Sequence, residues 1–280
     1  MKNSCVIILS ILFLVFSMDS FSQKIGQSKS EIKSKSDSGD HHSGKRSHSS
    51  SGYDGGDNSF GNLIASGIIQ GFMFVTYYAA IGDYELEDHL RSHLTNYPFY
   101  NGKSGNYEHP DAVPVPIKYL RFDLENQFLN NNQNLFGNHL KLKIRPMQYF
   151  YLQGDFFQLV EQDKWTRAHS NLSLFNFNLC YDRFRFENFN FGWTVGVNYI
   201  GNEINEAGFS YGLNAELFIA KNVSIYSSAK WSSINKAVVN EFQIQPKYHI
   251  GRFFVSFGYE HLKIGKPYFD FISMGGGIYL

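Results

Sequence analysis

The residues best suited to acid–base chemistry in residues 117–280 are four histidines: His139, His169, His249 and His261. A histidine base works in catalysis when it lies beside a nucleophile and is oriented by a third group. His249 shares a predicted strand face with Glu241 and Lys247, whereas Glu260 and His261 are adjacent and point to opposite faces. The sequence contains no GxSxG motif and no phosphate-binding glycine loop with a lysine. We therefore predict no catalytic or cofactor-binding residues and interpret these histidines as polar filling of an interior.

Histidine spacing near the N-terminus raises the question of metal binding. His41, His42 and His48 could bind Zn, Ni or Cu weakly, but no cysteine or carboxylate completes a tight set. His89 and His93 are four residues apart and would share one face of a helix, yet no third ligand follows and HExxH is absent. We predict no metal site and interpret these residues as a solvated tether and a wet helix face.

A basic cluster lies on the second predicted strand, where Lys141, Lys143 and Arg145 alternate with apolar residues. Near a rim of the fold these cations could bind the phosphates of anionic lipid or lipopolysaccharide. Asp123 and Glu125 on the preceding strand are closer candidates. We expect the basic cluster to pair with these two carboxylates in an interior.

Overall charge and cysteine content exclude several classes of protein. The 25 basic and 25 acidic residues give a net charge of +0, so nothing points to a nucleic-acid partner. Of the two cysteines, Cys5 lies in the leader and Cys180 stands alone, which excludes a disulfide-stapled fold. Aromatic residues make up 17% of the chain. They favour strands and suit membrane–water interfaces.

The first 22 residues are predicted to be a cleaved signal peptide. Lys2 precedes the apolar run Cys5–Phe16, and Ser20-Phe21-Ser22 supplies small residues at a cleavage site. Residues 23–58 are rich in Ser, Gly, Lys, Asp and His, with Ile25 and Ile32 as the only aliphatic residues. Such a composition cannot offset the entropy of ordering, so we expect a disordered linker.

Residues 59–116 are predicted to form an apolar and amphipathic helical segment with a proline-rich connector. Residues 59–82 carry no charge, which predicts a helix packed at a barrel mouth, inside the barrel or on a membrane surface. Two further strands are the alternative, because a continuous apolar run has no diagnostic period. Leucines spaced four apart predict an amphipathic helix over Asp83–Leu94, and Thr95–Pro116 is the connector.

Residues 117–280 alternate apolar and polar side chains in segments of about ten residues, the length that a tilted membrane strand needs. Phe and Tyr are dense on the apolar face, whereas Gly, Asn, Ser and charged residues occupy the other. We predict an all-β fold, an antiparallel transmembrane β-barrel of about ten strands, in a range of about eight to twelve, with an N-terminal helical segment. A soluble secreted β-barrel that binds a ligand is the alternative, with the apolar face turned inward.

Connections between the predicted strands alternate in length, as they do in membrane barrels, where periplasmic turns are short and external loops longer. The predicted periplasmic turns are Arg145–Met147, Asp182–Asn188, Ala220–Asn222 and Ile250–Arg252. The predicted external loops are Asn130–Gly137, Glu161–Ala168, Gly201–Glu206, Ser232–Lys236 and Gly265–Pro267. An even strand number then places the N-terminal segment on the periplasmic side.

The last predicted strand, Ser273–Leu280, resembles the C-terminal sorting strand of bacterial outer-membrane β-barrel proteins. It has a polar Ser273, then Gly275, and hydrophobic residues at Ile278 and Leu280, although the family usually ends in an aromatic residue. The Ser-Phe-Ser/Gln processing site is similar to those of Bacteroidetes-type secreted proteins. The resemblance implies an outer-membrane location, contact with lipid and lipopolysaccharide, and recognition of Ser273–Leu280 by the barrel-assembly machinery. We expect this strand to close the barrel against Ile117–Leu129.

Three classes of function are compatible with these features. A barrel of about eight to ten strands is mostly filled by side chains, so a wide pore is not expected. We favour a non-enzymatic outer-membrane barrel with an envelope-structural or anchoring role. A lipid-modifying barrel enzyme, which would need a Ser–His pair at the outer rim, and a narrow solute channel are the alternatives.

Overall fold

The computed structural model describes residues 24–37, 77–102, 105–109, 120–131, 134–147, 149–162 and 168–280. The predicted signal peptide, most of the predicted linker and the uncharged run up to residue 76 lie outside these ranges.

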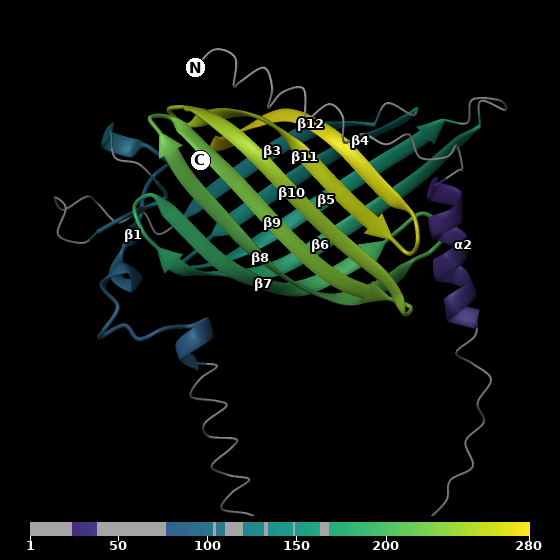
Figure 1. The fold of residues 1–280 in the computed structure, drawn as a ribbon, viewed down its shortest axis with the longest axis horizontal. Helices are drawn as coiled ribbons and strands as arrows, with labels where there is room; N and C mark the ends of the chain where they lie inside the picture. Colours follow the sequence, from purple (N-terminus) through teal and green to yellow (C-terminus); the bar gives the residue numbers. More distant parts are fainter. Residues whose placement is uncertain are drawn as a thin grey trace, which may run out of the picture.

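Ten antiparallel strands close into a barrel, which confirms the predicted fold class (Figure 1). Around the wall each strand pairs with its neighbours in the chain, and the last strand pairs with the first. The strands are β3 (Arg121–Asn131), β4 (Leu135–Arg145), β5 (Phe150–Gln162), β6 (His169–Arg185), β7 (Phe189–Ile200), β8 (Glu206–Ala220), β9 (Val223–Ile234), β10 (Ala237–Ile250), β11 (Phe253–Ile264) and β12 (Tyr268–Tyr279).

The seam between β12 and β3 is the closure predicted from the sequence. Met274 lies opposite Phe128, and Ile278 lies opposite Leu124. Phe122 and Leu280 exchange two backbone hydrogen bonds, of 3.1 and 2.8 Å, beyond the end of β12. With the seam paired, the sheet has no open edge.

Short turns join the strands at the end of the barrel where β12 finishes. They span 146–149, 186–188, 221–222 and 251–252, whereas the connections at the other end span 132–134, 163–168, 201–205, 235–236 and 265–267. Three predicted connections prove shorter by at least three residues because the strands run further than expected: Asp182–Asn188, Ser232–Lys236 and Asn130–Gly137. Asn235 and Lys236 both have positive φ, as a type I′ turn requires.

The wall carries apolar side chains outside and polar side chains inside, with the faces assigned as predicted. Phe177 is 62% exposed and Met274 64%, whereas Lys141 in the lumen is 2% exposed. Other exposed wall residues include Leu124, Phe128, Leu140, Phe209, Tyr211, Phe242, Val255 and Phe257. The apolar surface of this barrel therefore faces its surroundings.

One end of the barrel, called the helix end below, is covered by α2 (Lys24–Asp37), at the right of Figure 1. The prediction of a disordered linker is wrong for these residues. Ile25 and Ile32 lie two helical turns apart and are both fully buried on an aliphatic cluster of the barrel mouth. The Glu161 carboxylate accepts hydrogen bonds from the Lys24 and Ile25 backbone N–H groups at the helix start, at 3.1 and 2.9 Å. Among the helices that the structure describes, none is long and apolar enough to span a membrane.

The opposite end, called the hairpin end, carries residues 77–102 and 105–109, coloured blue in Figure 1. These contain a helical turn at 77–80, the 3-10 helices η1 (Asp88–Arg91) and η2 (Tyr100–Gly102), and the short hairpin β1 (His93–Leu94) and β2 (Tyr107–Glu108).

The predicted amphipathic helix over Asp83–Leu94 is therefore wrong. The Glu87 side chain accepts a hydrogen bond from the Asp83 backbone N–H, and Arg185 donates to the Leu90 carbonyl. Both contacts use backbone groups of the predicted helix. Tertiary packing therefore overrides the local helix propensity of this segment.

The two described parts of the N-terminal segment lie at opposite ends of the barrel. α2 contacts the last residues of β5 and β11, whereas residues 78–81 contact β6 and β7 near the turn at 186–188. The prediction that the whole N-terminal segment lies on one side of the barrel is therefore wrong for the described residues.

Candidate functional site

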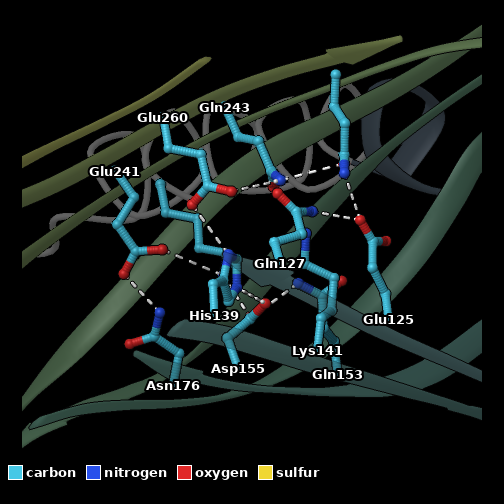
Figure 2. Close-up of polar contacts among 12 residues, drawn as sticks. Glu125, Gln127, His139, Lys141, Gln153, Asp155, Asn176, Glu241, Gln243 and Glu260 are labelled. Atoms are coloured by element: carbon cyan, nitrogen blue, oxygen red, sulfur yellow. Dashed lines mark hydrogen bonds and ion pairs between the residues drawn. The ribbon is translucent and has the colours of Figure 1, made fainter. Parts of the chain in front are cut away.

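The centre of the lumen holds a network of buried charged and amide side chains (Figure 2). His139 on β4 bridges two carboxylates: its Nδ1 lies 2.9 Å from Glu260 and its Nε2 lies 3.1 Å from Asp155. The ring also stacks on Phe157, with 3.7 Å between ring centroids. His139, one of the four candidate histidines, is thus held by side chains of the adjacent strand β5 and of β11, which lies three strands away around the wall.

Lys230 on β9 crosses the lumen to the same site. Its ammonium group lies 2.6 Å from Asp155 and 3.4 Å from Glu241, and Asn176 donates to Glu241 at 2.5 Å. The sequence did not indicate Lys230, because its strand has the weakest alternation of the ten.

The basic cluster on β4 pairs only in part as predicted. Arg145 contacts Asp123 at 3.3 Å. Glu125 instead binds Lys247 at 2.8 Å, and Lys141 donates to Gln243 at 2.7 Å. The strand register places Glu125 opposite Lys141, but Lys247 from across the lumen binds the Glu125 carboxylate.

Lys247, Glu241 and His249 do share the lumen face, as expected, but they do not form one group. Each of the first two binds a partner on another strand, and His249 binds Ser224.

The hairpin end is closed by an arginine–carboxylate cluster. Arg145 lies 3.1 Å from Asp182, and Tyr107 of β2 donates to the same carboxylate at 2.5 Å. Arg121 binds Asp123 at 2.7 Å and donates to the Thr95 carbonyl at 3.1 Å. Bidentate guanidinium geometry lets two arginines hold the hairpin and the wall together.

Residues 77–91 continue this contact over the outer wall of β6 and β7. Arg183 donates to the Tyr78 and Ala79 carbonyls and to Glu87, at 3.0, 3.2 and 2.9 Å. This hydrogen bond from Arg183 holds the pKa of Glu87 below its ordinary value. Trp193 donates to the Ala80 carbonyl at 2.9 Å.

His89 lies in η1 and stacks on Phe186, with 4.4 Å between ring centroids. Burial lowers its pKa below the ordinary value for histidine, so the neutral ring is favoured at pH 7. His93 belongs to strand β1 and shares no helix face with His89.

A serine–histidine pair does occur, in the lumen near the hairpin end. Ser224 Oγ lies 2.9 Å from His249 Nε2, and its hydroxyl is also 3.0 Å from Glu216. Ser224 is fully buried, and among the described side chains no group hydrogen-bonds His249 Nδ1. A nucleophile needs access to substrate and an oriented base, and among the described residues this pair has neither.

The remaining candidate histidines lie apart from the central network. His261 is on the outer face, 2.6 Å from Asp270, opposite in direction to Glu260 as predicted. His169 is exposed at the start of β6, and His41, His42 and His48 lie outside the described residues. Within the described ranges, no group of three or more His, Cys, Asp or Glu side chains could hold a metal ion.

At the helix end the lumen is aliphatic. The buried residues include Leu129, Leu135, Leu159, Leu172, Leu174, Ile200, Ile234, Val239 and Ile264, with Ile25 and Ile32 of α2 on top. The alternation of the sequence predicted a polar inner face for the strands. At the helix end the inward-facing side chains are aliphatic instead.

Comparison with known proteins adds a fold-level result. No protein-family model and no curated protein matches the chain. Its structural neighbours are bacterial outer-membrane β-barrel proteins. The COG4313 outer membrane channel from Pseudomonas putida F1 has a TM-score of 0.34 and 8% identity, covering 62% of this chain and 99% of that chain.

Two structures of Ail from Yersinia pestis are also similar. Ail in a phospholipid bilayer nanodisc has a TM-score of 0.34 and 10% identity, covering 57% of this chain and 99% of that chain. The crystal structure of Ail, the attachment invasion locus protein, has a TM-score of 0.28 and 11% identity, covering 57% and 96%. At these identities the similarity concerns the fold alone.

Proposed function

We propose that this chain is a sealed, non-enzymatic outer-membrane β-barrel that anchors its N-terminal segments to the envelope. The observation that carries the proposal is the reversal of polarity across the wall. Large apolar side chains are exposed outside, while charged side chains such as Lys141, Arg145 and Asp155 are buried inside. A closed barrel of this kind satisfies its backbone and suits a hydrocarbon surround.

Sealing of the lumen supports anchoring over conduction. α2 covers one mouth and the β1–β2 hairpin the other. Among the described residues, two cavities between these covers have volumes of about 20 and about 10 Å³, the first near the hairpin end and the second beside His139. One cavity holds about one water molecule and the other less, which is too little for a solute path.

Turn lengths support an orientation. The shorter connections lie at the hairpin end, which corresponds to the periplasmic side in outer-membrane barrels. In this proposal the hairpin faces the periplasm and α2 faces outward, and the outer face of the wall contacts lipid. Recognition of Ser273–Leu280 by the barrel-assembly machinery remains part of the proposal.

Fractionation of the envelope tests the location. We expect the full chain in the outer-membrane fraction, with a gel mobility that changes on boiling because a folded barrel migrates differently from the unfolded chain. Recovery in the soluble fraction with one unchanging mobility would contradict the proposal.

Planar-bilayer recording tests the sealed lumen. Purified full chain is expected to give no stable conductance steps, whereas steps of constant size would favour the channel. As a positive control, Arg145→Ala should loosen the hairpin and permit transient openings.

A further inference from the structure

Three lysine ammonium groups surround one tyrosine ring in the lumen. The Nζ atoms of Lys141, Lys143 and Lys247 lie 4.8, 4.5 and 4.9 Å from the centroid of the Tyr226 ring. All four side chains are buried or nearly so, with exposed fractions of 2 to 8%. Lysines repel one another at such a site unless negative charge lies between them.

Lys143 differs from the other two in its partners. Lys247 is paired with Glu125, and Lys141 donates to the neutral Gln243. Among the described residues, no carboxylate lies within ion-pair distance of Lys143, whose contacts are with the Tyr226 and Tyr151 rings. Asp123 lies opposite Lys143 in the register, but Arg121 and Arg145 bind it.

The lining of the nearby cavity is rich in positive charge. The cavity has a volume of about 20 Å³ and is lined by Arg121, Lys141, Lys143, Arg145 and Lys247, with Asp123, Glu125 and Glu216 as the acidic residues. Asp182 offsets one further charge through Arg145. Within this set of nine residues one positive charge remains in excess, and the next carboxylate along the lumen, Glu260, is bound by Gln243 and His139. A buried charge without a counter-charge is costly.

A neighbouring polar group also lacks a partner. Tyr226 is 2% exposed, and in the described part of the chain nothing hydrogen-bonds its hydroxyl. It contacts the same three lysines through its ring. Buried hydroxyls in folded proteins are almost always paired. Tyr226 is not among the residues that line the cavity, so its unpaired hydroxyl concerns the space around the three lysines and not the cavity itself.

We propose that this cavity binds one small monovalent anion of the chloride class, held by Lys143 together with the neighbouring lysines. The volume corresponds to about one water-sized particle, which admits a halide and excludes phosphate or sulfate. A water molecule would satisfy hydrogen bonds but leave the charge excess. The site belongs to the barrel interior and does not depend on which membrane the barrel occupies.

Heat stability of the folded full chain measures binding, because a ligand that binds only the folded state raises the unfolding midpoint with its concentration. The midpoint of the gel-mobility change is compared in sodium chloride, sodium gluconate and sodium phosphate at equal ionic strength. We expect the midpoint to rise with chloride and to stay level in gluconate. Phosphate stabilises folded proteins by exclusion from their surface, so any rise that it causes should be the same in the parent chain and in Lys143→Met.

Lys143→Met removes the unpaired charge and keeps most of the side-chain length. It is expected to abolish the chloride dependence and to be at least as heat-resistant as the parent chain in gluconate. The matched control is Lys263→Met on the outer face, which should keep the full chloride dependence. Equal midpoints of the parent chain in chloride and gluconate, or an unchanged chloride response in Lys143→Met, would overturn the proposal.

A second measurement holds even if Lys143→Met does not fold. Crystals of the parent chain soaked in bromide should show an anomalous-scattering peak in the cavity beside Lys143. A well-ordered barrel without a peak there would refute the site.

Discussion

The two ends of the barrel are closed by different physical means. At the helix end, Ile25 and Ile32 of α2 pack on an aliphatic cluster. At the hairpin end, Arg121 and Arg145 join the hairpin to the wall through the carboxylates of Asp123 and Asp182. Apolar packing is non-directional and is not weakened by ionic screening, whereas the charged closure requires each partner in place.

The two closures should respond differently to the loss of a single side chain. Loss of one aliphatic side chain leaves a cavity whose cost depends on local collapse. Loss of one arginine leaves a buried carboxylate without its counter-charge, so the damage reaches every group in the cluster. The hairpin end should therefore respond to single substitutions, pH and salt more strongly than the helix end.

The largest effect is expected at Arg145, which contacts Asp123, Asp182 and the ring of Tyr151. Arg145→Met should destabilise the folded barrel by about 3–5 kcal/mol, because it leaves a buried carboxylate underpaired. Denaturant unfolding in detergent, followed by gel mobility, measures the loss. Arg252→Met, exposed in a turn at the same end, should change stability by less than about 0.5 kcal/mol. Equal effects of the two variants would remove the contrast.

A smaller and more local effect is expected at Ile32. Ile32→Ala should weaken the docking of α2 by about 2 kcal/mol through lost burial, with little dependence on salt. Hydrogen exchange of the α2 amides should become faster while the strands stay protected. Gln27→Ala, on the exposed side of the same helix, is the control. Exchange that spreads to β6 and β10 would show that the helix is part of the barrel's cooperative unit instead.

The smallest effect concerns pH at the hairpin end. The pKa of Glu87 is lowered in the folded chain. Its ionised carboxylate therefore stabilises the docking of residues 77–91 above pH 4.5, its ordinary pKa, and this stabilisation is lost as the pH falls through the lower folded value. The pKa of His89 is also lowered in the folded chain. Below its ordinary pKa of 6.5 the ring takes up a proton when residues 77–91 are undocked, so their docking weakens as the pH falls. Both groups favour docking at neutral pH.

Limited proteolysis between residues 77 and 91 from pH 7 to about pH 4 follows this change. Cleavage should increase as the pH falls, and His89→Phe should delay the increase by keeping the stack on Phe186 without a titrating group. His169→Phe at the helix end should leave the profile unchanged. A profile that is identical in parent and His89→Phe chains would exclude His89 from the response.

Most of the wall could be predicted from the sequence because side chains on a strand alternate strictly. Phe175, Phe177 and Leu179 face outward and Asn176 and Asn178 inward, as expected. The turn at Ile250–Arg252 and the closure by β12 followed from the same counting. A two-residue period can be recognised in the sequence without knowing which residues are in contact in the folded protein.

The interior partners could not be predicted. Lys247 binds Glu125 across the lumen although Lys141 is the register neighbour of Glu125, because the choice depends on barrel width and side-chain reach. Inward-facing Leu172 and Leu174 break the polar alternation, and they do so because α2 covers them. The one sequence signal for α2 was the spacing of Ile25 and Ile32, which a composition argument does not register.

The pairing of β12 with β3 has a consequence for the order of events in biosynthesis. The strand that completes the cylinder is the last barrel strand to leave the ribosome, while its partner is the first. A shorter nascent chain therefore presents two unpaired strand edges and a surface rich in Phe and Tyr, both of which favour aggregation. Contacts this distant in sequence also form slowly. The chain must be kept unfolded until translation has passed β12, and any factor that holds it competes with premature edge pairing.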